Sequence, residues 1–133
     1  MIFVDTSVWI DYFNGNDTAA TDRLDTALQG EAVVIGDLVL LEILQGFRRE
    51  ADYQQAKLSL EHLAIYDLLG RDAVEEYARY FRILRKRGIT IRKTANVIIA
   101  GFCIVNRIPL LFEDKDFRPF VKHLGLRSVL QAA

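Results

Sequence analysis

The sequence contains a single cysteine, Cys103, and only two histidines, His62 and His123. One cysteine cannot build an internal disulfide framework, so we expect a protein that folds in the reducing cytoplasm. The two histidines are far apart and show no metal-ligand spacing, which argues against a zinc site. Apolar runs are also short. None approaches the roughly 20 residues that span a bilayer, and Asp5 interrupts the first of them, so we predict neither a membrane helix nor a secretory signal.

The composition is that of an ordinary globular protein, with 51% hydrophobic and 26% charged residues. At 133 residues, we expect a single domain spanning 1–133. The formal net charge of −1 gives the whole molecule no general attraction for nucleic acid. One segment is nevertheless basic, which suits either a solvated helix end or contacts with phosphates. Its candidate contact residues are Arg85, Lys86, Arg87, Arg92 and Lys93.

Short apolar runs alternate with patterns of helical period along the chain. The predicted strands cover 2–4, 32–35, 65–69, 109–112 and, at the end, 128–130. The predicted helices cover 6–13, 17–29, 38–45, 51–63, 72–87, 95–105 and 117–124. Strands that alternate with helices in this way predict an α/β fold with a central parallel sheet.

Acidic residues stand where apolar ones are expected. Asp5 directly follows the first predicted strand, and Asp114 and Asp116 follow the strand at 109–112. Glu42 lies in a predicted helix that is apolar on nearly every face, where an unpaired carboxylate is costly. Each acid alone could be a helix cap, a turn residue or a surface group. Because the carboxyl ends of parallel strands meet at one edge, we expect these acids to gather there.

Several carboxylates in one place repel each other unless a cation neutralises them. Oxygen ligands without histidine or cysteine favour Mg²⁺ or Mn²⁺. Such an ion activates water and stabilises the charge that develops on a phosphoryl group. The sequence offers no Ser/His or Cys/His arrangement for a protein nucleophile, so this pattern indicates metal-assisted phosphoryl chemistry.

Four segments, in order, resemble the motifs of PIN-domain ribonucleases, and most closely those of the VapC-like toxins. They are 4–9 (VDTSVW), 41–46 (LEILQG), 94–100 (TANVIIA) and 110–117 (LLFEDKDF). The resemblance implies a PIN-like three-layer fold with a parallel sheet of four or five short strands. It implies Mg²⁺- or Mn²⁺-dependent endonucleolytic cleavage of RNA. It also implies a small antitoxin whose carboxyl-terminal segment wraps the toxin, and a toxin homodimer or a hetero-oligomer with the antitoxin.

The resemblance also assigns roles to particular residues. Asp5 and Glu42 match the first two acids of the family's catalytic cluster, Asp114 matches the fourth, and Asp116 assists. Thr6 matches the hydroxyl residue that orients the first acid. The metal would be held by Asp5, Asp114 and the residue at position 96, and the basic segment would contact RNA.

Position 96 departs from the family pattern, because this chain carries Asn96 where an aspartate is expected. The amide oxygen can still face a metal, but the group adds no negative charge and its NH₂ cannot accept. We therefore predict a ribonuclease that is weakened or inactive. Two explanations fit the presence of Asn96. One is natural drift toward an inactive binding protein, and the other is a deliberate substitution that makes a toxic enzyme harmless. We favour the second because the other motifs are intact.

Three other functions share some of these features. A phosphatase of the haloacid-dehalogenase type also places an aspartate after its first strand, but it needs a second one where Ser7 stands. A receiver-like module needs two adjacent acids, and Asp5 has no acidic neighbour. A catalytically dead PIN fold that only binds RNA or antitoxin stays open because of Asn96.

Overall fold

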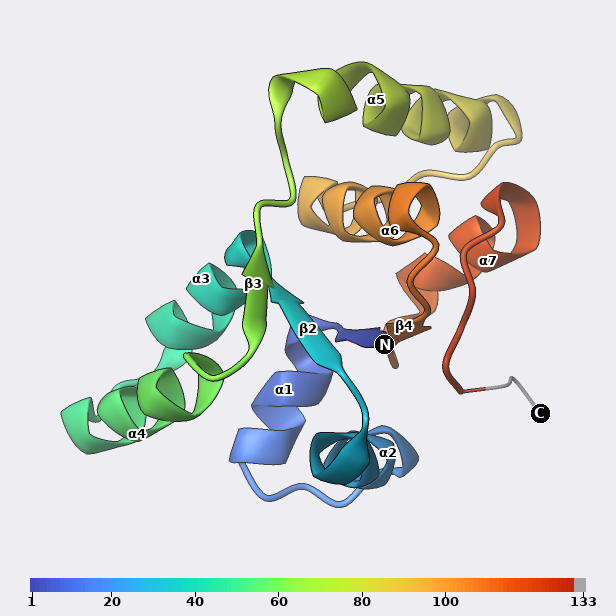
Figure 1. Cartoon of the computed structure of the whole chain (residues 1–133). Helices are drawn as coiled ribbons and strands as arrows, with labels where there is room; N and C mark the ends of the chain where they lie inside the picture. Colours follow the sequence, from blue (N-terminus) through green and yellow to red (C-terminus); the bar gives the residue numbers. More distant parts are fainter. Residues whose placement is uncertain (131–133) are drawn as a thin grey trace.

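The computed structural model describes residues 1–130, and four short parallel strands lie at its centre (Figure 1). The strands are β1 (Ile2–Val4), β2 (Val33–Gly36), β3 (Ala64–Tyr66) and β4 (Leu110–Leu111). They lie in the order β3-β2-β1-β4, and each neighbouring pair is parallel. The predicted α/β fold with a parallel sheet is therefore confirmed.

Helices enclose this sheet on two sides, which gives the three-layer arrangement. Figure 1 shows α5, α6 and α7 on one side of the sheet, with α1 to α4 on the other side and beside its edge. The helices are α1 (Thr6–Phe13), α2 (Ala19–Gly30), α3 (Asp37–Gly46), α4 (Glu50–Leu60), α5 (Arg71–Lys86), α6 (Thr94–Asn106) and α7 (Arg118–Leu124). A 3₁₀ turn, η1 (Lys115–Phe117), leads directly into α7.

The middle of the sheet is apolar because both of its faces are covered. Phe3 of β1 pairs with Val34 on one side and with Leu110 on the other, and all three side chains are buried. The edge strand β3 differs, since all of its residues are exposed. Its pairing with β2 ends at Tyr66, two residues before Leu68, whose N–H donates to the Asp37 carboxylate at 3.1 Å. The strand predicted at 65–69 is therefore shorter in the structure, where β3 has three residues and begins at Ala64.

Three predicted boundaries are wrong, two of them near the carboxyl-terminal end of the chain. The strand predicted at 128–130 is reduced to one bridge between Ser128 and Leu110, because β4 offers only two residues for pairing. The helix predicted at 117–124 begins at Arg118, after η1, with Pro119 in its first turn. The helix predicted at 51–63 covers 50–60.

The packing of α5 on α6 fixes the position of the α6 amino terminus. At Gly101 of α6, a Cβ atom would lie 2.4 Å from Cδ1 of Tyr77 on α5. Tyr77 is held in place because its hydroxyl donates to the Leu68 carbonyl at 3.0 Å. On the same helix as Gly101, Cys103 is buried, as predicted for a small core residue, and burial raises the pKa of its thiol.

Candidate functional site

Asp5 lies at the carboxyl end of β1 and occupies the cap position of α1. The residue is only 4% exposed. Ser7 Oγ donates to Asp5 Oδ2 at 2.9 Å, and the Asp5 backbone N–H donates to the Leu111 carbonyl at 3.0 Å. Burial raises the pKa of Asp5 from 3.8 to about 6, against the opposing hydrogen bonds from Ser7 and the Thr6 backbone. Within residues 1–130, no Lys, Arg or His forms an ion pair with this carboxylate.

Asp114 lies near Asp5, because β4 runs next to β1 and ends at Leu111, three residues before Asp114. The negative charge of Asp114 contributes to the raised pKa of Asp5. Asp114 Oδ1 accepts a hydrogen bond from the Asp116 backbone N–H at 2.9 Å. The two carboxylates thus approach each other at one edge of the sheet, as the strand ends predict.

Asn96 enters the same site from the first turn of α6 and is 5% exposed. Its Nδ2 donates to Asp114 Oδ2 at 3.3 Å. An aspartate at position 96 could not donate this bond unless it were protonated, and its charge would repel Asp114. Asparagine at this position therefore makes a hydrogen bond where an aspartate would make a like-charge contact.

Glu42 reaches the site from α3 through Thr6. Thr6 Oγ1 donates to Glu42 Oε1 at 2.7 Å. Glu42 is half-buried rather than enclosed, because α3 leaves one face open, where Leu41 is 57% exposed. The predicted role of Thr6 also needs correction: its hydroxyl holds Glu42, and only its backbone N–H stabilises ionised Asp5. The hydroxyl that holds Asp5 is that of Ser7, which the sequence motifs did not single out as a site residue.

The remaining acid, Asp116, is half-buried in η1, two residues after Asp114. Within residues 1–130, no three His, Cys, Asp or Glu side chains lie together closely enough to bind a metal ion. The predicted metal ligands are two aspartates and an amide, so the third oxygen would have to come from Asn96.

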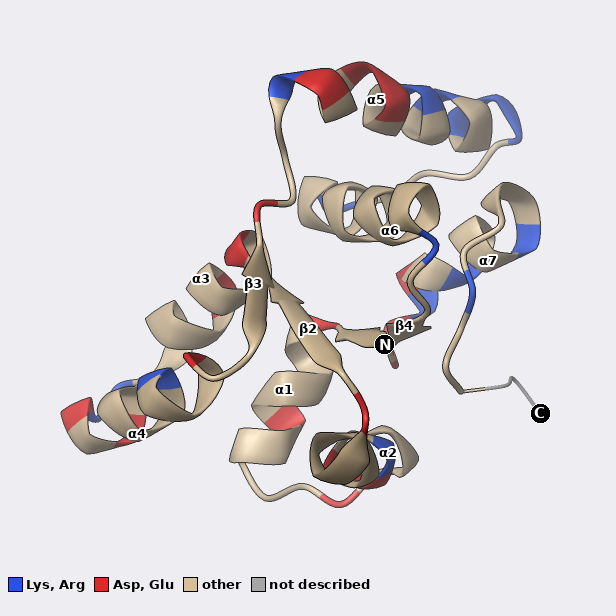
Figure 2. Cartoon of the chain, in the orientation of Figure 1, with Lys and Arg blue, Asp and Glu red and all other residues tan. Residues whose placement is uncertain are grey.

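The basic segment is divided between two places. Arg92 and Lys93 immediately precede α6 and therefore lie near Asn96. Arg85, Lys86 and Arg87 lie at the far end of α5, where Figure 2 shows basic residues on the same side as those of α7. The five candidate contacts thus do not form one cluster around the acids.

The fold and these motifs agree with the comparison to protein families. The PIN domain model matches residues 2–121, so the chain belongs to the PIN-domain family. Its relatives include Ribonuclease VapC1 of Methanocaldococcus jannaschii, which is 30% identical over 95% of this chain and 85% of the relative. Ribonuclease VapC11 of Mycobacterium tuberculosis is 29% identical over 96% of this chain and 97% of the relative.

Solved structures show the same fold at lower sequence identity. One is a structure of VapBC2 from Rickettsia felis bound to a DNA fragment from its promoter, with a TM-score of 0.76 and 19% identity. It matches over 96% of this chain and 97% of the other. A toxin-antitoxin complex from Klebsiella pneumoniae gives a TM-score of 0.71 at 16% identity, over 99% of this chain and 100% of the other. None of the described helices is long and apolar enough to cross a membrane.

Proposed function

We propose that this chain is the ribonuclease toxin of a toxin–antitoxin pair, with a divalent-metal site at Asp5, Asn96 and Asp114 and an activity reduced by Asn96. One observation carries the proposal. The buried Asp5 carboxylate lies near Asp114 in a PIN fold, and no cationic side chain within residues 1–130 forms an ion pair with either acid. Buried charges without a partner are costly, so a bound cation is the natural complement of this arrangement.

The residues fit Mg²⁺ or Mn²⁺ by their chemistry. The carboxylates of Asp5 and Asp114 are hard oxygen donors, and the Asn96 amide supplies a neutral third oxygen. Its NH₂, which donates to Asp114, cannot bind a cation. We therefore expect the site to hold a divalent ion, but with lower affinity than a site with three carboxylates.

Ser7, Thr6 and Glu42 have distinct tasks in the proposed cleavage of RNA. When bound, the divalent ion lowers the pKa of a water molecule and offsets negative charge on the phosphoryl group. Ser7 and the adjacent backbone favour the ionised form of Asp5. Thr6 fixes Glu42 through Oε1, which leaves Oε2 available to accept a proton from the attacking water.

The partner we propose is a small antitoxin that covers the acid cluster. The structurally similar chains come from VapBC2 and from a toxin-antitoxin complex, which supports a partner of this kind. We further propose that the chain forms a homodimer, or a hetero-oligomer with its antitoxin, in the cytoplasm. RNA is the proposed substrate because the named relatives are ribonucleases.

A catalytically inactive binding module is the second candidate. The hydrogen bond from Asn96 to Asp114 favours it, because this bond stabilises the site without any metal. The scaffold would then bind RNA or antitoxin and cleave nothing. The two candidates predict different effects of restoring the acid at position 96.

The test is the Asn96→Asp variant, incubated with a fluorogenic RNA and Mg²⁺ or Mn²⁺. We expect it to cleave the RNA much faster than the parent chain, with no cleavage in EDTA or of the DNA version of the probe. Adding Asp5→Ala to this variant should abolish the activity, and circular dichroism should show that each variant is folded. A folded Asn96→Asp variant that cleaves no RNA with either metal would show that the ribonuclease assignment is wrong.

A further inference from the structure

A groove of about 880 Å³ lies between α7, the end of β4 and the carboxyl-terminal segment. It begins next to the acid cluster, since Phe112 and Glu113, which immediately precede Asp114, both line it. Along α7 its lining includes Arg118, Val121 and Lys122. Three further lining residues, Leu126, Arg127 and Leu130, belong to the segment that follows α7.

The charged groups of this groove are mainly basic. Arg118 and Lys122 are four residues apart on α7 and so lie on one face of the helix. Arg127 lines the same groove, whereas among the lining residues within 1–130 Glu113 alone is acidic. Within residues 1–130, none of these three cations forms an ion pair, and all three are exposed. The groove therefore presents three positive charges without an ionic partner to a ligand.

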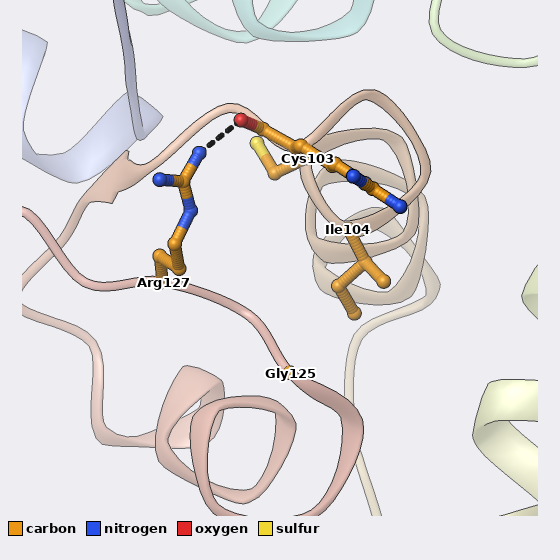
Figure 3. A pocket seen from close by; sticks show the side chains of 5 residues that line it. Cys103, Ile104, Gly125 and Arg127 are labelled. Carbon is orange, nitrogen blue, oxygen red and sulfur yellow. Dashed lines mark hydrogen bonds between the residues drawn. The ribbon is translucent and has the colours of Figure 1, made fainter.

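A second pocket, of about 410 Å³, shares one lining residue, Arg127, with the first. Figure 3 shows Arg127 directed toward the end of α6, where its guanidinium donates to the Arg107 carbonyl, and Ile104 projecting from α6 on the side of Gly125. Arg107 is the only non-glycine residue with positive φ within residues 1–130, at 56°. A helix end in this conformation normally takes glycine or asparagine, so an arginine there costs backbone energy and gains a charge in the pocket.

We propose that these two hollows form one binding track for single-stranded RNA, which we call the α7 track. Its defining residues are Phe112, Arg118, Lys122, Arg127 and Arg107. Phe112 would stack on a base beside the acid cluster, and the four cations would contact successive phosphates toward the end of α6. The proposal rests on the proposed function, because it makes the track the path of the strand that the acid cluster cleaves.

The dimensions and the lining both favour an extended strand. Arg107 is eleven residues beyond Asn96. This separation corresponds to about 16 Å along α6, which is longer than a single nucleotide. The exposed apolar side chain of Val121 suits the bases of a single strand, whereas a duplex would present mainly phosphates and sugars. The negative end of the α6 dipole opposes an anion, but its half charge is smaller than the charges of Arg107 and Arg127 together.

The binding test uses the full parent chain in EDTA, so that RNA is bound and not cleaved. The double variant Arg107→Gly/Arg127→Gln removes two cations, and glycine suits the backbone at position 107. We expect it to bind a labelled single-stranded RNA about tenfold more weakly at low salt. The slope of log affinity against log salt should fall by about 1.4, which corresponds to two lost phosphate contacts at about 0.7 each. Phe112→Leu should also weaken binding about tenfold, without changing this slope.

The matched control is Arg48→Gln/Arg49→Gln, which removes the same charge from an exposed turn between α3 and α4. We expect this control to bind RNA like the parent. Equal losses in the two double variants, or no loss in Arg107→Gly/Arg127→Gln, would overturn the track. A loss of binding to an acidic peptide with unchanged binding to RNA would overturn it as well, because the surface would then serve a protein partner.

The same variants in the Asn96→Asp background separate this inference from the proposed function. Cleavage of a single-stranded RNA of ten or more nucleotides should fall about tenfold in Arg107→Gly/Arg127→Gln and should be unchanged in the control Arg48→Gln/Arg49→Gln. If Asn96→Asp cleaves no RNA but the parent's RNA binding shows the expected losses, the proposed function is wrong and the track stands as a binding surface. If cleavage occurs and the losses are absent, the track is wrong and the proposed function stands.

Discussion

Replacing Asp5 by asparagine should stabilise the metal-free protein, although it should destroy the site. Asp5 is 4% exposed, and burial raises its pKa from 3.8 to about 6. Each tenfold change in a protonation equilibrium is worth about 1.36 kcal/mol, so ionised Asp5 costs the fold about 3 kcal/mol at pH 7. Asparagine has nearly the same shape, stays neutral, and can still accept the Ser7 hydroxyl at its amide oxygen.

The stability should fall as the pH rises, because the pKa of Asp5 is higher in the folded chain than in the unfolded chain. Below about pH 3 the carboxyl is protonated in both folded and unfolded chains, and Asp5 costs nothing. As the pH rises from about 3 to 7, the unfolded chain releases its proton first, so the free energy of unfolding falls by about 3 kcal/mol. Above about pH 7 this cost stays constant.

Urea unfolding in EDTA measures this directly. We expect Asp5→Asn to raise the free energy of unfolding by about 1 to 3 kcal/mol at pH 7 and by almost nothing at pH 3, the lower figure at pH 7 allowing for imperfect pairing of the new NH₂. The control is Asp67→Asn, at an exposed carboxylate without an ion pair within residues 1–130, which should change little. An Asp5→Asn variant that is less stable than the parent at pH 7 would show that ionised Asp5 does not destabilise the fold.

Three further predictions follow from individual contacts. In the Asn96→Asp background, Thr6→Val should lower cleavage at least tenfold and Thr6→Ser should retain it, because only the hydroxyl holds Glu42, at a cost of about 1.5 to 3 kcal/mol when lost. Gly101→Ala should lower the free energy of unfolding by about 1 to 2 kcal/mol in urea titrations, since the clash with Tyr77 exceeds the gain in helix propensity. Cys103 should react with an alkylating reagent only as the chain unfolds, because its thiol is buried and its pKa is raised; rapid labelling of folded protein would contradict this.

The sequence was sufficient to predict that acidic residues at the carboxyl ends of neighbouring strands lie close together. Asp5 and Asp114 each follow a buried strand, and parallel pairing of β1 with β4 brings them together without further information. The exposure of Glu42 could not be predicted, because the apolar pattern of α3 does not show that one of its faces stays open. Likewise, two adjacent hydroxyls leave it undecided which acid each one holds, and only the turn into α1 assigns Ser7 to Asp5 and Thr6 to Glu42.

The basic residues show a different limit of sequence-based prediction. Residues 85–93 are continuous in the chain, but the loop between α5 and α6 separates their two ends in space. The cations that line the groove beside the acids come from α7 and the segment after it, where no run of basic residues marks them. Their grouping depends on tertiary packing, which a count of charges along the sequence does not contain.

We propose that Asp5, Asn96 and Asp114 form a divalent-metal site that Asn96 weakens. The most direct measurement is a calorimetric titration of Mn²⁺ into the parent chain and into Asn96→Asp at neutral pH. We predict one site, bound at least about tenfold more tightly by Asn96→Asp, which corresponds to about 1.4 kcal/mol for the restored carboxylate. Adding Asp5→Asn should remove this binding. Equal affinities in the parent and in Asn96→Asp, or binding that survives Asp5→Asn, would contradict a metal site at these residues.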